Sequence, residues 1–344
     1  MRNLFPLVDD LKKYDLAKLR GDSTAGITVG IMLIPQGMAY AMLAGLPPVY
    51  GLYAAIFPQL LYAFLGTSRQ LAVGPVSMDS IIIASGLSLL AISNTDHYIA
   101  LAIMLALLMG LIQLFMGVLK LGFVVNFLSK PVINGFTYAA ALVISLSQLK
   151  HLFGIDISAS NYTHEIILDI INRIDLINWL SVLIGIVSML GIWLLGKWNK
   201  QIPSTVLIVI ISIIAAKYGH WKEAGINVVG EIPGGLPGFA FPNVMSNEFF
   251  ELLPVAATLA MIGFMESYSI SKRIQANHNS EYRIDANREL IALGSGNIFG
   301  SFFSSFPISG GFSRSAVNES SGAKTGIASL ISAGVVTITL LFLL

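Results

Sequence analysis

Two charged residues lie inside long apolar stretches of this sequence. Arg314 follows a Gly-Gly pair in the segment FPISGGFSRSAVN, and Glu266 lies in the segment AATLAMIGFMESYS. An arginine at the centre of a membrane costs about 2.5 to 3.5 kcal/mol on insertion scales, so a functional reason for it is expected. A buried guanidinium is well suited to bind an anion, and a buried carboxylate can take up and release a proton.

The composition indicates an integral membrane protein. Hydrophobic residues make up 55% of the chain and charged residues 11%, against about 25% charged residues in soluble domains, and the mean hydropathy is +0.76. There is no cysteine, which excludes disulfides and thiolate metal sites. The histidines show no ligand spacing, so we predict neither a metal nor a cofactor. The N-terminal segment lacks the apolar core of a secretory signal, so we expect none.

A membrane span takes about 20 apolar residues, and about eleven segments approach this, some of them short or broken. The predicted spans lie near residues 24–43, 50–65, 76–92, 99–119, 123–149, 179–195, 203–218, 252–271, 289–302, 310–320 and 326–344. With the N-terminus in the cytosol, most lysines and arginines fall in cytosolic connections, in agreement with the positive-inside rule. We therefore predict a multi-pass protein with a cytosolic N-terminus.

Two of these segments are interrupted by glycine and proline. In residues 70–80 the break is at Gly74-Pro75, and in residues 302–318 it is at Gly310-Gly311. Each predicts an extended piece followed by a half-helix that begins inside the membrane, where irregular backbone must face protein or a water-filled cavity. Two converging half-helix N-termini would form a cradle for an anion. The alternative is that the glycines only allow close helix packing.

Four motifs, in order along the chain, are similar to those of one transporter family. They are IPQGMAYAMLAGLPPVYGLYAA (residues 34–55), AVGPVSMDS (72–80), KPVINGF (130–136) and SGGFSRSAVNESSGAKT (309–325). With these motifs the chain resembles the SulP family of anion transporters, the sulfate permeases. The first and last motifs are specific, and the four occur in order between residues 34 and 325, so the resemblance extends along the whole chain.

The resemblance implies an all-α polytopic fold of two inverted repeats of seven spans, arranged as core and gate domains and followed by a STAS domain. The half-helices of spans 3 and 10 would meet at the bilayer midplane with the anion between them, and the core would move against the gate as an elevator. About 11 of the 14 spans would be present, with spans 12–14 and the STAS domain absent. The implied parts are a cytosolic lead-in (1–23), core spans 1–4 (24–119), gate spans 5–7 (120–218), an outer connection (219–251) and core spans 8–11 (252–344).

The resemblance also assigns roles to individual residues. Gln36 would face the anion, and Glu266 would couple transport to protons, since the matching position carries an acid in proton- or sodium-coupled members. Alternatively, Tyr40 is a packing aromatic and Glu266 a static partner of Arg314. The predicted substrate-binding residues are Gln36, Tyr40, Val76, Ser77, Phe312, Ser313 and Arg314, with backbone N–H groups acting at Val76 and Phe312 and Ser309 as a further hydroxyl donor.

We therefore predict a secondary active transporter for proton-coupled sulfate uptake, in contact with membrane lipid, homodimeric at full length and in a bacterial inner membrane. An anion exchanger or a sodium-coupled bicarbonate transporter of the same family remains an alternative, as does a proton-coupled nucleobase permease of the same fold. Sulfate, bicarbonate, chloride and dicarboxylates would all suit such a cradle. The sequence shows no nucleophile with a base in reach, so we do not predict an enzyme. It also shows no pattern of basic and aromatic residues that would suggest binding to nucleic acid. The segment GSGNIFG (residues 294–300) lacks the strand of a dinucleotide site, so we expect it to pack helices.

Overall fold

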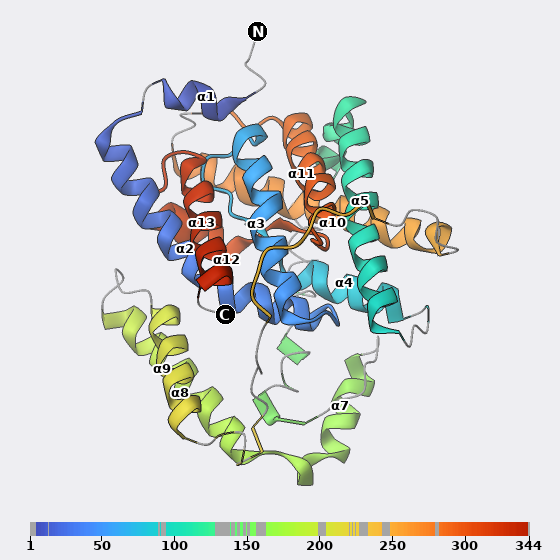
Figure 1. Ribbon diagram of the computed structural model, residues 1–344, viewed down its shortest axis with the longest axis vertical. Helices are drawn as coiled ribbons and strands as arrows, with labels where there is room; N and C mark the ends of the chain where they lie inside the picture. Colours follow the sequence, from blue (N-terminus) through green and yellow to red (C-terminus); the bar gives the residue numbers. More distant parts are fainter. Residues whose placement is uncertain are drawn as a thin grey trace. The chain divides into compact units, whose positions relative to one another are not determined.

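The computed structural model describes most of the chain in two compact units (Figure 1). The first unit consists of Met1–Phe127 and Ile232–Leu344, and the second of Leu128–Glu231. The described residues are 5–12, 14–88, 90, 94–127, 138, 142, 145, 146, 149, 152–155, 163–198, 204–219, 221, 223, 225, 226, 233–242, 248–278 and 282–342.

The described parts are almost entirely helical. The first unit contains α1 (Pro6–Leu11), α2 (Leu16–Leu43), α3 (Pro48–Leu65), β1 (Val73–Gly74), α4 (Ser77–Ser88), α5 (Thr95–Val118), η1 (Leu121–Phe127), α10 (Phe249–Asn277), α11 (Ala286–Ser301), β2 (Ser309–Gly310), α12 (Phe312–Ser320) and α13 (Ile327–Phe342). The second unit contains α7 (Thr163–Asn172), η2 (Ile174–Leu176), α8 (Trp179–Trp198) and α9 (Ser204–Tyr218).

The helices coincide with the predicted spans over most of the chain. In the described residues α2, α3, α5, α8 and α10 are long and apolar enough to cross a membrane. Helix α2 begins at Leu16, before the predicted residue 24, because the Asp15 side chain caps it by accepting a hydrogen bond of 2.8 Å from the Lys18 amide. The predicted span at residues 123–149 lies largely outside the described residues. The all-α membrane fold is confirmed, with two short strands at the predicted breaks.

Glycines allow the central helices of the first unit to touch along their backbones. Helix α11 packs along α5 and against α3, and a Cβ added at Gly294 would lie 2.7 Å from the Gly110 carbonyl oxygen. The prediction that GSGNIFG packs helices is therefore confirmed. Helix α2 packs on α3 and α13 (Figure 1), and a Cβ at Gly51 would lie 2.0 Å from the carbonyl oxygen of Gly37.

Two buried carboxylates stabilise, by hydrogen bonds, the connections next to the two interrupted segments. Glu289, at the start of α11, accepts hydrogen bonds from the Tyr62 hydroxyl at 2.7 Å and from the backbone amides of Thr67 and Ser68 at 2.6 and 3.1 Å. These bonds hold the turn between α3 and β1. Asp22 on α2 accepts from the Lys324 and Thr325 amides and the Thr325 hydroxyl, which holds the connection between α12 and α13. Buried charges need such partners to be stable.

Candidate functional site

The two breaks in the sequence lie side by side in the structure. Strands β1 and β2 pair antiparallel, with Val73 opposite Gly310 and Gly74 opposite Ser309. Helices α4 and α12 begin directly after them. Because the strands are antiparallel, the half-helices leave the pair in opposite directions, so their N-terminal ends meet. The structure thus brings together two segments that are more than 200 residues apart in the sequence.

Polar side chains from the neighbouring helices hold β2 in place. Asn297 on α11 accepts a hydrogen bond of 2.9 Å from the Ile308 amide and donates one of 3.1 Å to the Ile308 carbonyl. The Ser267 hydroxyl on α10 accepts from the Gly310 amide at 2.7 Å. A Cβ at Gly310 would lie 3.0 Å from that hydroxyl and 3.1 Å from the Ser267 Cα, so glycine allows this close approach without a shift. The irregular backbone is therefore satisfied by protein, as membrane depth demands.

The N-terminal ends of both half-helices present backbone amides that precede the first intrahelical hydrogen bond. The first intrahelical bond near α12 runs from the Ser315 amide to the Gly311 carbonyl, and Gly311 supplies no side-chain cap. At α4 the corresponding bond runs from Ser80 to Val76. The amides of the first turn therefore have no partner within their own helix. With the positive ends of the helix dipoles, they make an environment that favours an anion.

Arg314 lies in the first turn of α12 and is almost fully buried, with 1% of its surface exposed. Its Nη1 donates a 2.7 Å hydrogen bond to the Pro75 carbonyl oxygen, just before α4. Its Nε and Nη2 have no hydrogen-bond partner among the described residues. A Cβ at Gly311 would lie 2.7 Å from the Arg314 Cζ, so the guanidinium folds back over a glycine. Two donors of a buried cation are therefore left to hold a ligand.

Two carboxylates act electrostatically on this arginine, and one of them was predicted from the sequence. Glu266 on α10 is the predicted acid, and its Oε2 is buried without a hydrogen-bond partner in the described part of the chain. The other is Asp79, in the first turn of α4 and fully buried. It lies in the motif AVGPVSMDS, for which the sequence predicted no role of the aspartate. An acid one turn after a half-helix break was the signal that could have found it.

Most of the other predicted residues lie on α2, at the start of α4 and at the start of α12. On α2, Tyr40 lies within electrostatic range of Arg314, and the buried Oε1 of Gln36 has no partner among the described residues. Ser77 is half-buried at the start of α4. Phe312 and Ser313 are exposed at the start of α12, where the Phe312 ring lies 5.2 Å from the Arg273 guanidinium carbon.

Val76 is buried directly before α4, and the Ser309 hydroxyl on β2 is buried without a partner in the described residues. Unsatisfied buried polar atoms are rare in folded proteins and call for a ligand, ion or water. Within the described residues, no three acidic or histidine side chains converge as a metal site.

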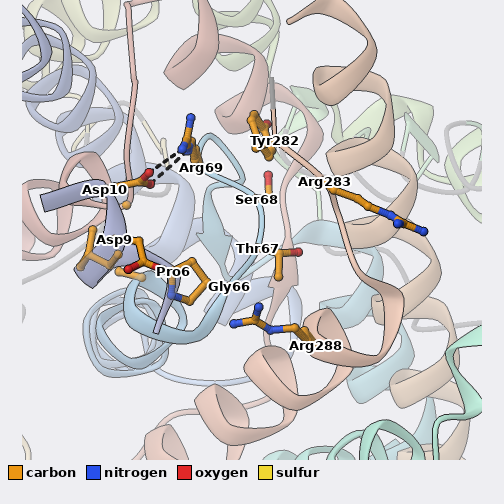
Figure 2. Close-up of a pocket in the computed structure, with 13 residues that line it drawn as sticks. Pro6, Asp9, Asp10, Gly66, Thr67, Ser68, Arg69, Tyr282, Arg283 and Arg288 are labelled. Carbon is orange, nitrogen blue, oxygen red and sulfur yellow. Dashed lines mark hydrogen bonds and ion pairs between the residues drawn. The ribbon is translucent and has the colours of Figure 1, made fainter. Parts of the chain in front are cut away.

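A polar cavity of about 170 Å³ lies where α1 packs on α3 (Figure 2). Arg69 donates to Asp10 through Nε, at 3.0 Å, and through Nη2, and its guanidinium lies 5.2 Å from the Tyr282 ring centre. Burial raises the pKa of Tyr282 to about 12, so its hydroxyl stays protonated at physiological pH. Arg283 and Arg288 also line the cavity. This cavity contains none of the predicted anion-site residues.

Comparison with known proteins identifies the family. Over 349 residues the chain is 41% identical to "Sulfate transporter 4.1, chloroplastic" of Arabidopsis thaliana, covering 99% of this chain and 50% of that protein. It is 34% identical to "Probable sulfate transporter MT1781" of Mycobacterium tuberculosis, covering 98% and 60%. The solved structure of the murine Solute Carrier 26 family member A9 anion transporter, in the inward-facing state, matches with a TM-score of 0.88 and 30% identity, covering 99% and 59%.

The chain therefore spans about half the length of the curated relatives it matches. The structural match agrees with the fold that the motifs implied, an inverted-repeat transporter with two half-helices. The family model described as "Sulfate permease family" matches residues 19–344. This chain belongs to the sulfate permease family, as its motifs at the two breaks had indicated.

Proposed function

We propose that the full-length protein is a secondary active transporter that takes up an inorganic oxyanion, sulfate, together with protons. The observation that carries this proposal is Arg314, buried between two half-helix N-termini with two guanidinium nitrogens unpartnered in the described residues. The plant and mycobacterial relatives are named sulfate transporters, and the murine protein is called an anion transporter. These names support an anion as the substrate of this protein.

In this proposal the anion lies between α4 and α12. Arg314 contributes its Nε and Nη2, and the half-helices contribute the amides beside Val76 and Phe312. Hydrogen bonds to charged groups are worth about 1.5 to 3 kcal/mol each. Hydroxyls of Ser77 and Ser313 are placed at the same helix starts, and Ser309 offers a buried hydroxyl without a partner in the described part. Gln36 and Tyr40 on α2 complete the proposed set.

Glu266 is the proposed proton-coupling residue. It acts electrostatically on Arg314. Because burying a charge is costly, a buried carboxylate favours the protonated, neutral form. When Glu266 binds a proton, Arg314 loses the attraction of a competing negative charge and is free to hold an anion. When the proton leaves on the cytosolic side, the carboxylate competes again and favours release. Proton binding and anion binding thus support each other.

We further propose that transport proceeds by an elevator movement of the core, residues 24–119 and 252–344, against the gate at residues 120–218. The division of the chain into two compact units supports this assignment, because both half-helices lie in the same unit. A site carried by a single unit can move as a rigid body with its ligand. Residues 219–251 would connect the two on the outer side, and residues 1–23 would lead in from the cytosol.

The proposed location is a bacterial inner membrane, with the N-terminus in the cytosol and a homodimer at full length. The cavity in Figure 2 supports the orientation, because Arg69, Arg283 and Arg288 gather at the same end of the unit as α1. Clustering of arginines at one end agrees with the positive-inside rule. The multi-pass helical fold itself belongs to the family.

The nucleobase permease alternative fits the site less well than an anion transporter. An uncharged base needs no fixed cation, whereas a buried arginine with free donors is costly unless an anion meets it. An exchanger of the same family differs from a symporter because its site returns loaded with a second anion, whereas the site of a symporter returns empty. The two are separated by experiment.

The experiment is uptake of radiolabelled sulfate into proteoliposomes that contain the full-length protein, with and without an inward proton gradient. We expect accumulation driven by the gradient and reduced in Glu266→Gln. Glu251→Gln, an exposed acid at the start of the same helix, serves as the matched control. Uptake that ignores the gradient but requires internal chloride or bicarbonate would make the protein an exchanger and overturn proton coupling.

A further inference from the structure

Asp79 is the buried charge that the proposed mechanism leaves without a role. It lies in the first turn of α4 and is fully buried, and its carboxylate makes no well-formed hydrogen bond among the described residues, where the Ser309 hydroxyl is the side-chain donor that acts on it. Buried carboxylates with a structural role accept several hydrogen bonds, as Glu289 and Asp22 do in this same unit. Asp79 therefore differs from the structural acids of this protein.

The groups that face Asp79 come from the elements around the break. Glu266 approaches from α10, Arg314 from α12 and the Ser309 hydroxyl from β2. On α2, no titratable group of the described residues acts on Asp79, and Tyr40 lies within electrostatic range of Arg314. No charged group of α5, which also packs on α4, acts on Asp79 among the described residues. The site therefore contains two carboxylates and one guanidinium.

The charges of these three groups do not balance. With both acids ionised, the empty site carries a net charge of minus one. A dianion that entered with a single proton would leave a net charge of minus two, in a buried environment where like charges repel strongly. A dianion that entered with two protons, one on each carboxylate, would restore a net charge of minus one. The second carboxylate thus lets the loaded and the empty site carry the same charge.

We infer that Asp79 is a second proton-carrying residue of the transport cycle, so that each dianion moves with two protons and transport is electrically neutral. This inference rests on the proposed function. Both protons come from water on the entry side, bind to the carboxylates of Asp79 and Glu266, and return to water on the release side. Between entry and release, Arg314 and the N-terminal ends of the half-helices bind the dianion. No covalent bond of the anion forms or breaks.

The test is sulfate accumulation in proteoliposomes of the full-length protein, at membrane potentials set by potassium and valinomycin. With two protons per dianion, a gradient of one pH unit balances about a 100-fold sulfate gradient, independent of the potential; with one proton at zero potential it balances about a tenfold gradient. For the wild type we expect the sulfate gradient of about 100-fold, independent of the potential. For Asp79→Asn we expect the gradient of about tenfold at zero potential, with uptake stimulated by an inside-positive potential. Asp79→Asn with Glu266→Gln should lose gradient-driven accumulation altogether.

Two further measurements keep the outcomes distinct. Asp96→Asn changes an exposed aspartate in the first turn of α5 and should behave as the wild type. Where Asp79→Asn does not transport, the protons taken up on sulfate binding to the wild type in weak buffer decide the question, with about two per dianion expected.

One proton per dianion in the wild type, or an Asp79→Asn variant with unchanged stoichiometry, overturns the role of Asp79 and leaves proton coupling intact. A wild type that shows no response to the proton gradient overturns the proposed function itself.

Discussion

The Nη1 atom of Arg314 donates a 2.7 Å hydrogen bond to the carbonyl oxygen of Pro75, so the arginine of one half-helix is anchored at the break before the other. One donor of the guanidinium is thereby used in the protein, while Nε and Nη2 stay without a partner in the described residues. The planar guanidinium of an arginine can donate to the Pro75 carbonyl and to an anion at the same time. The single ammonium of a lysine cannot hold both in this geometry.

Arg314→Lys should retain the fold but weaken sulfate binding. The ammonium keeps one positive charge but cannot hold Pro75 and present two donors to the anion. Hydrogen bonds to charged groups of about 1.5 to 3 kcal/mol correspond to a rise of about 10- to 100-fold in the KM for sulfate uptake. Uptake at a series of sulfate concentrations measures this. Arg20→Lys, at an exposed position of α2, is the control and should leave KM unchanged; an equal KM for both variants would show that the fork has no role.

Gly311→Ala should displace the guanidinium of Arg314. The added Cβ would lie 2.7 Å from Cζ, closer than carbon atoms approach without a shift. We expect about a tenfold weaker apparent affinity for sulfate, with the protein still folded, because a flexible side chain can move away. Gly334→Ala is the matched control, since a Cβ at that position of α13 meets nothing within 4 Å. Equal affinities in the two variants would contradict the close packing of Arg314 on Gly311.

Glu289→Ala should destabilise the protein strongly. The carboxylate accepts bonds from Tyr62, Thr67 and Ser68, all of which would lose a charged partner in a buried place. We expect a loss of about 3 kcal/mol in the free energy of unfolding, measured in detergent micelles. Glu251→Ala removes an exposed acid from the first turn of α10 and should change stability by less than about 0.5 kcal/mol. A stable Glu289→Ala variant would be inconsistent with this network.

Gln36→Leu should raise stability and weaken anion binding at the same time. Its buried Oε1 has no partner in the described part of the chain, and an unsatisfied buried acceptor costs about 1 to 3 kcal/mol. Gln113→Leu is the contrast, because that buried glutamine donates to the Ala260 carbonyl and accepts from Asn297, so its loss should lower stability. Thermal unfolding and sulfate affinity measured together test this. A destabilised Gln36→Leu variant would show that the amide is satisfied within the protein.

The linear sequence carries the information that depends on neighbouring residues. Hydropathy located the spans because a membrane helix must be apolar along its own length. The breaks at Gly74 and Gly310 were visible because glycine and proline act locally on the backbone. Arg314 and Glu266 stood out because a charge within an apolar stretch is expensive wherever its partner lies. The glycines of residues 294–300 were correctly predicted to pack helices, because residues without a side chain let two helix backbones approach closely.

The tertiary structure decided what depends on contacts between distant segments. The pairing of Val73 with Gly310, and with it the meeting of the two half-helices, joins segments that the sequence separates widely. Asp79 and Glu289 are both acids near helix starts, and nothing in their local sequence says that Glu289 is held by several donors and that Asp79 makes no well-formed hydrogen bond among the described residues. That difference arises because the partners of a buried carboxylate come from other elements, and only packing brings them within hydrogen-bond distance.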